Sequence, residues 1–167
     1  HKFNEKKVTI QAIDLIKEEK IISLISDAGT PAISDPGLVI INQCIEKNFN
    51  IYPIPGPSSV TSAVSVAGFS DQYLFYGFLP KKENELEKVL KTLLNINYSI
   101  VFFIPAKKVN FYISKFKKYF SGRKIMIARE MTKIHEEYIR GDILSIGSLS
   151  ESLKGELTVV ISEKIKE

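Results

Sequence analysis

The sequence predicts an α/β fold in which helices cover mixed or parallel β-sheets. Short apolar segments of strand length alternate with longer segments of helical periodicity, and loops rich in glycine and proline separate them. Of the 167 residues, 44% are hydrophobic and 25% are charged, which is typical of a folded protein with a core. The length suits one ordinary domain or two small lobes.

The composition excludes several classes of protein. No apolar run approaches the length of a membrane span, so a transmembrane protein is excluded. Cys44 is the only cysteine, which excludes a disulfide framework and a multi-cysteine zinc site, and we expect no metal. A reducing compartment fits best, and we therefore expect a cytoplasmic protein. The net charge of +4 permits a nucleic-acid partner without requiring one.

The first part of the chain follows the order of a parallel βαβ arrangement. Apolar residues at helical spacing predict a first helix, and the almost wholly apolar run IISLIS predicts a strand buried on both faces. The expected elements are a helix over residues 8–19, a strand over 21–26, a loop over 27–37, a helix over 38–47, a strand over 49–54 and a helix over 59–66.

The second part of the chain predicts five further strands. They cover residues 73–78, 100–104, 124–129, 136–140 and 156–162. Helices are expected over residues 84–94 and 109–120, and a short helix over 143–153. The change of character near residues 69–75 places a boundary between an N-terminal lobe, residues 1–70, and a C-terminal lobe, residues 71–167.

The loop SDAGTPAISDPG, residues 26–37, follows the first predicted strand, where open α/β sheets bind ligands. Gly29 and Gly37 allow a close approach of the backbone to a ligand or a positive φ. The small side chains of Ala28 and Thr30 leave room for a bulky group. A tight loop whose aspartates cap their own backbone is an equally good interpretation of the residues alone.

A second loop, residues 53–59 (PIPGPSS), also follows a predicted strand and leads into a helix. Ser58 or Ser59 can act as the N-cap, and the exposed N–H groups of a helix start favour a carboxylate or phosphate. Capping alone would explain this loop taken by itself. Two such loops after neighbouring strands would face the same end of a sheet, and their convergence predicts a binding site.

A third segment, residues 129–141 (REMTKIHEEYIRG), contains seven charged or histidine side chains among thirteen residues. It is either a functional loop or a salt-bridged hairpin exposed to solvent. Walker and G-x-G-x-x-G loops and a Ser/His/Asp order are absent from the sequence, which argues against kinases, Rossmann dinucleotide-binding proteins and serine hydrolases.

Four motifs together resemble one family. SDAGTPAISDPG, PIPGPSSVTSAVSVAG, FYGFLPKK and AREMTKIHEEYIRGD are similar to the ribosomal RNA small subunit methyltransferase I group of the tetrapyrrole methylase superfamily, and the match runs from about residue 4 to residue 163. The resemblance implies two α/β lobes, S-adenosyl-L-methionine bound in the cleft between them, and a homodimer. It also implies methyl transfer to the 2′-hydroxyl of a cytidine in small-subunit ribosomal RNA, with the rRNA or the small subunit as partner.

The resemblance also assigns residues to the cofactor and to the substrate. By position it implies cofactor contacts for Ala28, Gly29, Thr30, Ile33, Ser58, Ser59, Ile104 and Met131. For catalysis we expect Glu136 to act as a base on the hydroxyl and Lys133 to orient the substrate or neutralise a phosphate. Phosphate contacts are open to Lys81, Lys82, Lys107, Lys108, Lys117, Lys118 and Arg123, although most of these also suit an ordinary surface.

Two departures from the family pattern keep rival functions open. The family begins with a strand and a TP-x-GNL-x-D loop, which this sequence lacks; residues 1–5 (HKFNE) resemble the family's later H-x-x-NE segment, so we expect one wall of the cleft to be absent from this chain. Residues 103–108 read FIPAKK where the family often has Y-E-x-P-H-R. The rivals are a tetrapyrrole C-methyltransferase, a dimerising module without activity, and a phosphate-binding protein.

Overall fold

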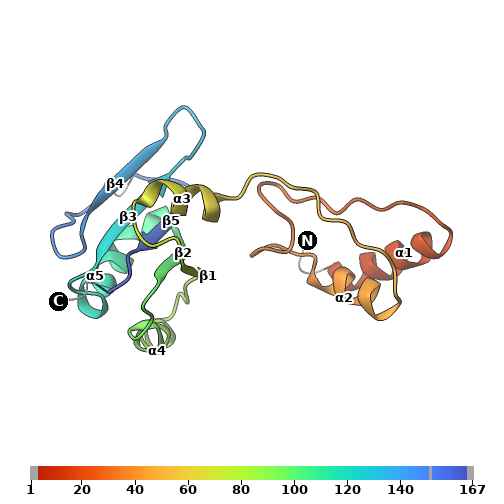
Figure 1. Ribbon diagram of the computed structural model, residues 1–167, viewed down its shortest axis with the longest axis horizontal. Helices are drawn as coiled ribbons and strands as arrows, with labels where there is room; N and C mark the ends of the chain where they lie inside the picture. Colours follow the sequence, from red (N-terminus) through yellow and green to blue (C-terminus); the bar gives the residue numbers. More distant parts are fainter. Residues whose placement is uncertain (1–3, 151, 165–167) are drawn as a thin grey trace. The chain divides into compact units, whose positions relative to one another are not determined.

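The computed structural model describes residues 4–150 and 152–164, and the chain divides into two compact units (Figure 1). The first unit ends at Ser58 and the second begins at Ser59. Residues 1–3 of the HKFNE segment lie outside the described residues. Across the described ranges, the helices are all too short or too polar to cross a membrane.

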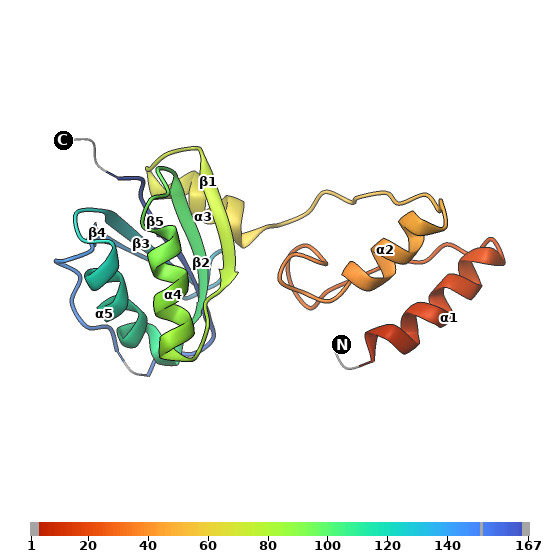
Figure 2. The same ribbon diagram turned by 90° about the horizontal axis from the view of Figure 1, so that it is seen from below.

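The first unit contains two helices, α1 (Glu5–Lys17) and α2 (Leu38–Glu46), which lie side by side (Figure 2). Ile13 of α1 and Cys44 of α2 are buried, as the apolar spacing of both segments predicts. Two residues after the end of each helix, a residue lies in the left-handed region: Glu19 with a φ of 62° after α1 and Asn48 with a φ of 58° after α2. These residues turn the chain out of each helix and into an extended stretch.

The two strands predicted for the first unit are wrong. Residues 21–26 and 49–54 form no strand, and Ile21, Ile25 and Ile54 are 95%, 84% and 85% exposed. An apolar run signals a buried strand only where a neighbouring strand bonds to its backbone and covers its side chains. Neither segment has a ladder partner in the described part of this unit, so both are extended but unpaired.

The second unit is built on a mixed five-stranded sheet, which confirms the α/β class and the five strands predicted for this half. The order in space is β1-β2-β5-β3-β4, with β1 and β2 parallel and every other neighbouring pair antiparallel. The strands are β1 (Tyr73–Phe78), β2 (Ser99–Pro105), β3 (Lys124–Arg129), β4 (Glu137–Asp142) and β5 (Glu156–Ile161).

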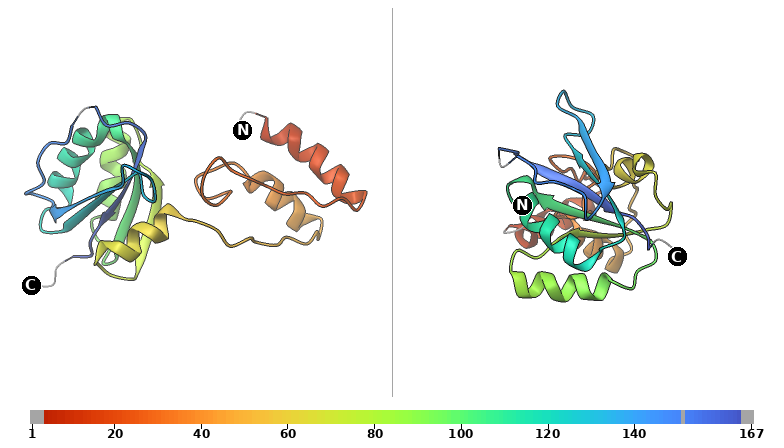
Figure 3. Two further views of the ribbon diagram at one scale, coloured as in Figure 1. Left: turned by 90° about the horizontal axis from the view of Figure 1, so that it is seen from above. Right: turned by 90° about the vertical axis from the view of Figure 1, so that its left-hand side faces the viewer.

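Helices cover both faces of this sheet (Figures 2 and 3). On one face, α4 (Glu83–Leu93) and α5 (Val109–Tyr119) bury Leu86, Leu90 and Phe116 against the sheet. On the other face, α3 (Ser59–Ala67) packs Val60 and Ala63 against alternate residues of the central strands. A turn of 3-10 helix, η1 (Ala106–Lys108), joins β2 to α5. The three helices predicted for these segments are therefore confirmed.

The short helix predicted over residues 143–153 is wrong in the part of that segment that the structure describes. A turn follows β4 and the chain then runs irregularly to residue 150. Ile143 and Ile146 are buried and produce an i, i+3 apolar spacing that imitates a helix. The side-chain amide of Asn110 donates to the carbonyl of Leu149 at 2.9 Å and accepts from its N–H at 2.8 Å, so a side chain satisfies this backbone.

The strand directions bring several loops to one edge of the sheet, which we call the carboxyl edge. β1, β2 and β3 end there, and β4 and β5 begin there. The N–H of Ala106 donates to the carbonyl of Gly155 at 3.0 Å and ties the loop after β2 to the loop before β5. Ligands of open α/β sheets bind outside the carboxyl ends of the strands, so this edge is where a site is expected.

Candidate functional site

The loop over residues 26–37 of the first unit, which we call the SDAGTP loop, is mostly exposed and has a constrained backbone. Gly29, Ala32 and Ser34 all lie in the left-handed region, with φ values of 71°, 65° and 62°. The hydroxyl of Ser26 lies 3.2 Å from the carbonyl oxygens of both Ala28 and Gly29, which bends the chain sharply there. A positive φ at a residue other than glycine, as at Ala32 and Ser34, costs free energy, and such residues cluster at functional sites.

The structure brings the two predicted binding loops of the first unit together. The hydroxyl of Thr30 donates to the carbonyl oxygen of Pro57 at 3.4 Å. A Cβ placed on Gly29 would come within 3.8 Å of the same oxygen and would meet nothing closer. Pro57 belongs to the predicted loop over residues 53–59, so this loop and the loop over residues 26–37 are neighbours. The strands expected before the two loops are not formed.

This loop suits a ligand with a polar part and an apolar part. Ala28, Gly29 and Thr30 are exposed, and Ile33, three residues further along, exposes 50% of its surface. S-adenosylmethionine combines a charged amino-acid group with an adenine ring, so these residues fit it: Ala28 to Thr30 can hold the polar group and Ile33 the apolar one. The assignment of these four residues stays a prediction.

Sequence reasoning missed the residue that anchors the far end of this loop. The carboxylate of Glu5 accepts hydrogen bonds from the N–H groups of Gly37 at 2.8 Å and Val39 at 3.3 Å. Gly37 is the N-cap residue of α2 and Val39 lies in its first turn, where N–H groups lack partners within the helix. The only signal in the sequence was the resemblance of residues 1–5 to an H-x-x-NE segment, which carried no role for the glutamate.

The cofactor residues predicted in the second unit lie in different environments. Ser59 begins α3 and is exposed. Ile104 is fully buried in the core beneath α4 and α5, whereas Met131 packs half-buried against the core beneath α3. The side chains of Ile104 and Met131 therefore lie on opposite faces of the sheet. A ligand at the carboxyl edge could reach only the backbone of Ile104.

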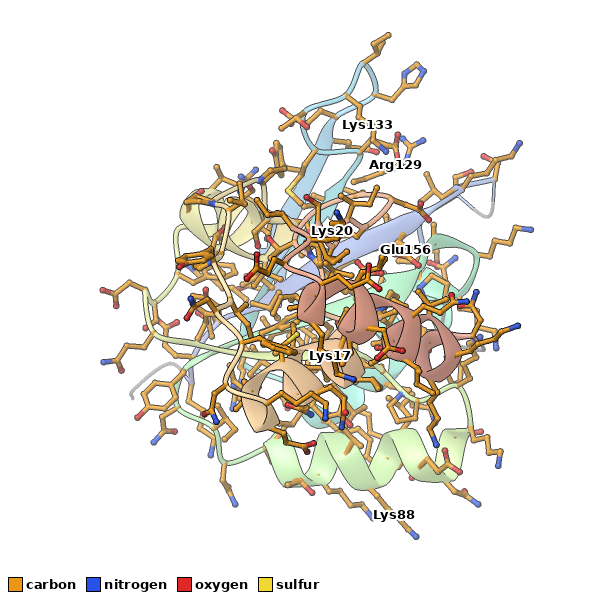
Figure 4. The ribbon with its side chains drawn as sticks, turned by 90° about the vertical axis from the view of Figure 1, so that its right-hand side faces the viewer. Lys17, Lys20, Lys88, Arg129, Lys133 and Glu156 are labelled. Carbon is orange, nitrogen blue, oxygen red and sulfur yellow. The ribbon has the colours of Figure 1, made fainter. Side chains whose placement is uncertain are left out.

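The loop between β3 and β4 projects from the carboxyl edge (Figures 1 and 3) and contains the predicted catalytic pair. Glu136 accepts a hydrogen bond from the N–H of Thr132 at 2.5 Å, and Lys133 lies 3.3 Å from the carboxylate of Glu130. Lys133, in this loop, and Arg129, at the end of β3, are labelled in Figure 4. Glu136 thus shapes the loop in which Lys133 sits.

Glu136 also affects the pKa of the neighbouring Tyr138. Burial raises the pKa of Tyr138, and hydrogen bonding to Glu136 and its negative charge raise it further. Tyr138 packs against the core beneath α3, and the guanidinium of Arg140 lies 5.0 Å from the centre of its ring. The carboxylate of Glu136 is therefore engaged with the backbone of its own loop and with β4, and a role as base on a substrate hydroxyl stays a prediction.

One of the expected phosphate-binding residues is instead part of the core. Arg123 is 3% exposed, and its guanidinium donates to three carbonyl oxygens, those of Ser162 at 3.2 Å and of Leu94 and Ile96 at 2.9 Å. Burial lowers the pKa of this guanidinium. The expectation that Arg123 contacts RNA is wrong, because its donors satisfy buried backbone groups.

Two of the expected phosphate contacts pair with carboxylates. Lys82 lies 3.4 Å from Glu85, and Lys118 lies 3.0 Å from Glu87. Lys81, Lys107 and Lys108 line an open pocket at the carboxyl edge. Groups of three or more acidic, histidine or cysteine side chains able to hold a metal ion do not occur among the residues described.

The amino-acid sequence matches the model of the Tetrapyrrole (Corrin/Porphyrin) Methylases over residues 1–146, a range that includes the SDAGTP loop and the β3–β4 loop. The chain belongs to this family. Within it, the chain belongs to the group named ribosomal RNA small subunit methyltransferase I. It is 40% identical over 164 residues to the protein of that name from Thermotoga maritima, covering 96% of this chain and 73% of that protein.

The Rickettsia prowazekii protein of the same name is 38% identical over 157 residues, covering 92% of this chain and 56% of that protein. This tetrapyrrole methylase chain thus spans between about half and three-quarters of the length of these two relatives.

Solved structures of other methyltransferases share the fold. The methyltransferase CobJ superposes with a TM-score of 0.68 at 16% identity, covering 93% of this chain and 70% of that one. Uroporphyrin-III C-methyl transferase from Thermus thermophilus, complexed with S-adenyl homocysteine, superposes with a TM-score of 0.51 at 9% identity, covering 81% of this chain and 63% of that one. At these identities the likeness concerns the fold, and the two-lobed arrangement with its cleft stays a prediction.

Proposed function

We propose that this chain carries the catalytic fold of an S-adenosylmethionine-dependent methyltransferase that modifies the 2′-hydroxyl of a cytidine in small-subunit ribosomal RNA. The observation that supports this most is the 40% identity to a protein named for small-subunit ribosomal RNA methylation, across 96% of the chain. The two solved structures described above are more distant in sequence, at 16% and 9% identity.

In this proposal the chain's main contribution is to position the reacting groups. When bound, S-adenosylmethionine supplies a methyl group that its sulfonium charge has already activated. The residues of the SDAGTP loop hold the donor, with Gly29 leaving the space it needs and Thr30 fixed against Pro57. Holding the hydroxyl oxygen, the methyl carbon and the sulfur in line lowers the barrier by removing translational and rotational freedom beforehand.

The β3–β4 loop is proposed to act on the RNA side. A new O–C bond forms as the C–S bond breaks, and the hydroxyl proton must pass to a base. Glu136 is the proposed base, and its short hydrogen bond to the N–H of Thr132 would fix the direction of its carboxylate. Lys133 is proposed to orient the substrate or to neutralise a phosphate, although in this structure it lies beside Glu130.

The partners follow from the same proposal. The substrate is the ribosomal RNA or the assembled small subunit, the compartment is the cytoplasm, and the active form is a homodimer, as the family resemblance implies. The surplus of four positive charges suits a polyanionic partner, since it accelerates the encounter with RNA at low salt.

The experiment begins with a calorimetric titration of the chain with S-adenosylhomocysteine. Methyl transfer from labelled S-adenosylmethionine to small ribosomal subunits follows, and the digested nucleosides are identified by mass spectrometry. We expect binding and the appearance of 2′-O-methylcytidine. A folded chain that binds no S-adenosylhomocysteine would favour the dimerising module, and methylation of a porphyrinogen precursor would favour the tetrapyrrole C-methyltransferase.

A matched pair of glycine variants tests the proposed cofactor loop. Gly29→Val should abolish S-adenosylhomocysteine binding in a folded chain, because the side chain occupies the open space beside the loop. Gly122→Val is the control, since Gly122 also has a positive φ, 80°, and open space around it, but lies in the turn between α5 and β3. Equal affinity of the two variants would remove Gly29 from the proposed site.

A further inference from the structure

A basic pocket lies at the carboxyl edge of the second unit, and its lining contains none of the residues assigned to the cofactor. Its volume is about 460 Å³, and its lining includes Lys81, Lys107, Lys108 and Phe111. Lys81 follows β1, whereas Lys107 and Lys108 form η1 after β2. Because β1 and β2 pair in parallel, with Phe78 beside Phe103, the two loops emerge next to each other.

The positive charges of this pocket lack carboxylate partners among the residues that the structure describes. In the part of the chain that the structure describes, Lys81, Lys107 and Lys108 form no ion pair. The one carboxylate in the lining, Glu83, is paired with Lys115. Three ammonium groups around one depression repel each other, and a bound anion would remove that repulsion.

The walls of the pocket are held in place by buried contacts. The hydroxyl of the buried Tyr112 donates to the carbonyl oxygen of Pro80 at 3.4 Å, which ties the Lys81 loop to α5. Asn110, beside Phe111, is fixed through both atoms of its amide to the backbone of Leu149. A pocket whose walls are fixed before binding loses less entropy when a ligand enters.

We propose that this pocket binds the phosphodiester backbone of a single-stranded RNA segment. Lysine ammonium groups suit phosphates as mobile point charges. Phe111 is partly exposed, with Nζ of Lys115 5.8 Å from its ring centre, and supplies an aromatic side chain against which a base can pack. The volume accommodates a nucleotide-sized group. This inference rests on the proposed function, which supplies the RNA, and extends it by naming a docking surface made of residues other than those assigned to the cofactor and to catalysis.

The test measures RNA binding as a function of salt. A fluorescently labelled single-stranded RNA from the decoding region of small-subunit rRNA is titrated by anisotropy with the full chain, with Lys107→Ala/Lys108→Ala and with Lys88→Ala/Lys91→Ala. The control pair removes the same charge from α4, where Lys88 points into solvent (Figure 4). Each phosphate contact on single-stranded nucleic acid contributes about 0.7 to the slope of log Kobs against log salt.

We expect the slope of Lys107→Ala/Lys108→Ala to fall by about 1.4, while Lys88→Ala/Lys91→Ala leaves it unchanged. Lys107→Arg/Lys108→Arg should retain the slope, because it keeps both charges. Inorganic tripolyphosphate in equimolar amounts should not displace the RNA, whereas displacement would show that the pocket takes free polyphosphates. Equal slopes for the two alanine pairs, or no RNA binding by the wild-type chain at low salt, would overturn the inference.

The same variants separate this inference from the proposed function. Lys107→Ala/Lys108→Ala should bind S-adenosylhomocysteine with wild-type affinity, because the cofactor loop lies elsewhere in the chain. If the wild-type chain binds RNA with the lysine-dependent slope but transfers no methyl group, the proposed function fails and the docking surface stands. If methyl transfer proceeds and the slopes do not differ, the docking surface alone fails.

Discussion

The carboxylate of Glu5 lies 2.8 Å from the backbone nitrogen of Gly37, a hydrogen bond that spans 32 positions of the sequence. A second bond, from the N–H of Val39 at 3.3 Å, reaches the same oxygen. A negative charge at the start of a helix satisfies N–H groups without partners and interacts favourably with the helix dipole. The first residue of α1 therefore fixes the end of the SDAGTP loop.

Replacing Glu5 should loosen this loop. Glu5→Ala leaves two donors without their partner and should cost about 1 kcal/mol, while Glu5→Gln keeps an acceptor and should cost less. Hydrogen exchange at Gly37 and Val39 measures the effect, and we expect faster exchange there in the alanine variant. Glu18→Ala, at an exposed glutamate beyond the end of α1, is the control. Unchanged exchange in Glu5→Ala would contradict the anchoring role.

Gly37 itself should tolerate no side chain. Its φ is 141°, and an added Cβ would lie 2.8 Å from a side-chain carbon of Leu24 and 3.3 Å from Cβ of Ala32. Gly37→Ala should therefore destabilise the first unit by about 1–3 kcal/mol. Gly56→Ala is the matched control in the same unit, because the nearest atom to its Cβ would be 4.0 Å away. Urea denaturation followed by circular dichroism should separate the two variants, and equal midpoints would contradict the strain argument.

The elements of the second unit were predicted well from the sequence, because its central strands are continuous apolar runs that are buried on both faces of the sheet. Met126 and Ile127 are both buried, one against α3 and the other against α4 and α5, as a continuous apolar run in a sheet covered on both faces requires. The same rule failed for Ile21 and Ile54, since an apolar run does not reveal whether a pairing strand is present.

The candidate site was predictable only in part, for a related reason. The resemblance located the loop around Gly29, and the structure brought it next to Pro57. The anchors are contacts between residues far apart in sequence, such as Glu5 with Gly37 and Tyr112 with Pro80. A sequence pattern reports local periodicity and composition, so it cannot reveal such partners.

Arg123 should be required for the stability of the second unit. Removing its side chain leaves the carbonyl oxygens that it bonds without a buried donor, and such groups cost about 1–3 kcal/mol each. We expect Arg123→Ala to lose about 3 kcal/mol or more in urea denaturation. Arg123→Lys should recover only part of the loss, because an ammonium cannot reproduce the planar fork of donors. If Arg123→Ala lowers the free energy of unfolding no more than Lys117→Ala does, Arg123 does not stabilise the core.

The charge network between α4 and α5 should make stability depend on acidity. Hydrogen bonds from Lys118 and then from Lys115 lower the pKa of Glu87 from 4.5 to about 2. A carboxyl whose pKa is lowered on folding stabilises the fold above pH 4.5, and this stabilisation is lost as the pH falls from 4.5 toward 2. Denaturation midpoints between pH 6 and pH 3 should fall less steeply in Glu87→Gln. Glu85→Gln, the control on the same helix, should follow the wild type, and a Glu87→Gln curve parallel to it would contradict the assignment.

Two variants of Glu136 test whether this residue acts as the base or only shapes its loop. Glu136→Gln keeps an oxygen that can accept the hydrogen bond from the N–H of Thr132 but cannot take a proton, whereas Glu136→Ala removes both properties. If Glu136 is the base, both variants should lose methyl transfer by 10²-fold or more while binding S-adenosylhomocysteine normally. If it only holds the loop, Glu136→Gln should retain most of the activity and only Glu136→Ala should lose it. The rate of methyl transfer by Glu136→Gln therefore decides between the two roles. The control for the loss of a nearby negative charge is Glu137→Gln, since the carboxylate of Glu137 lies 3.5 Å from Arg129.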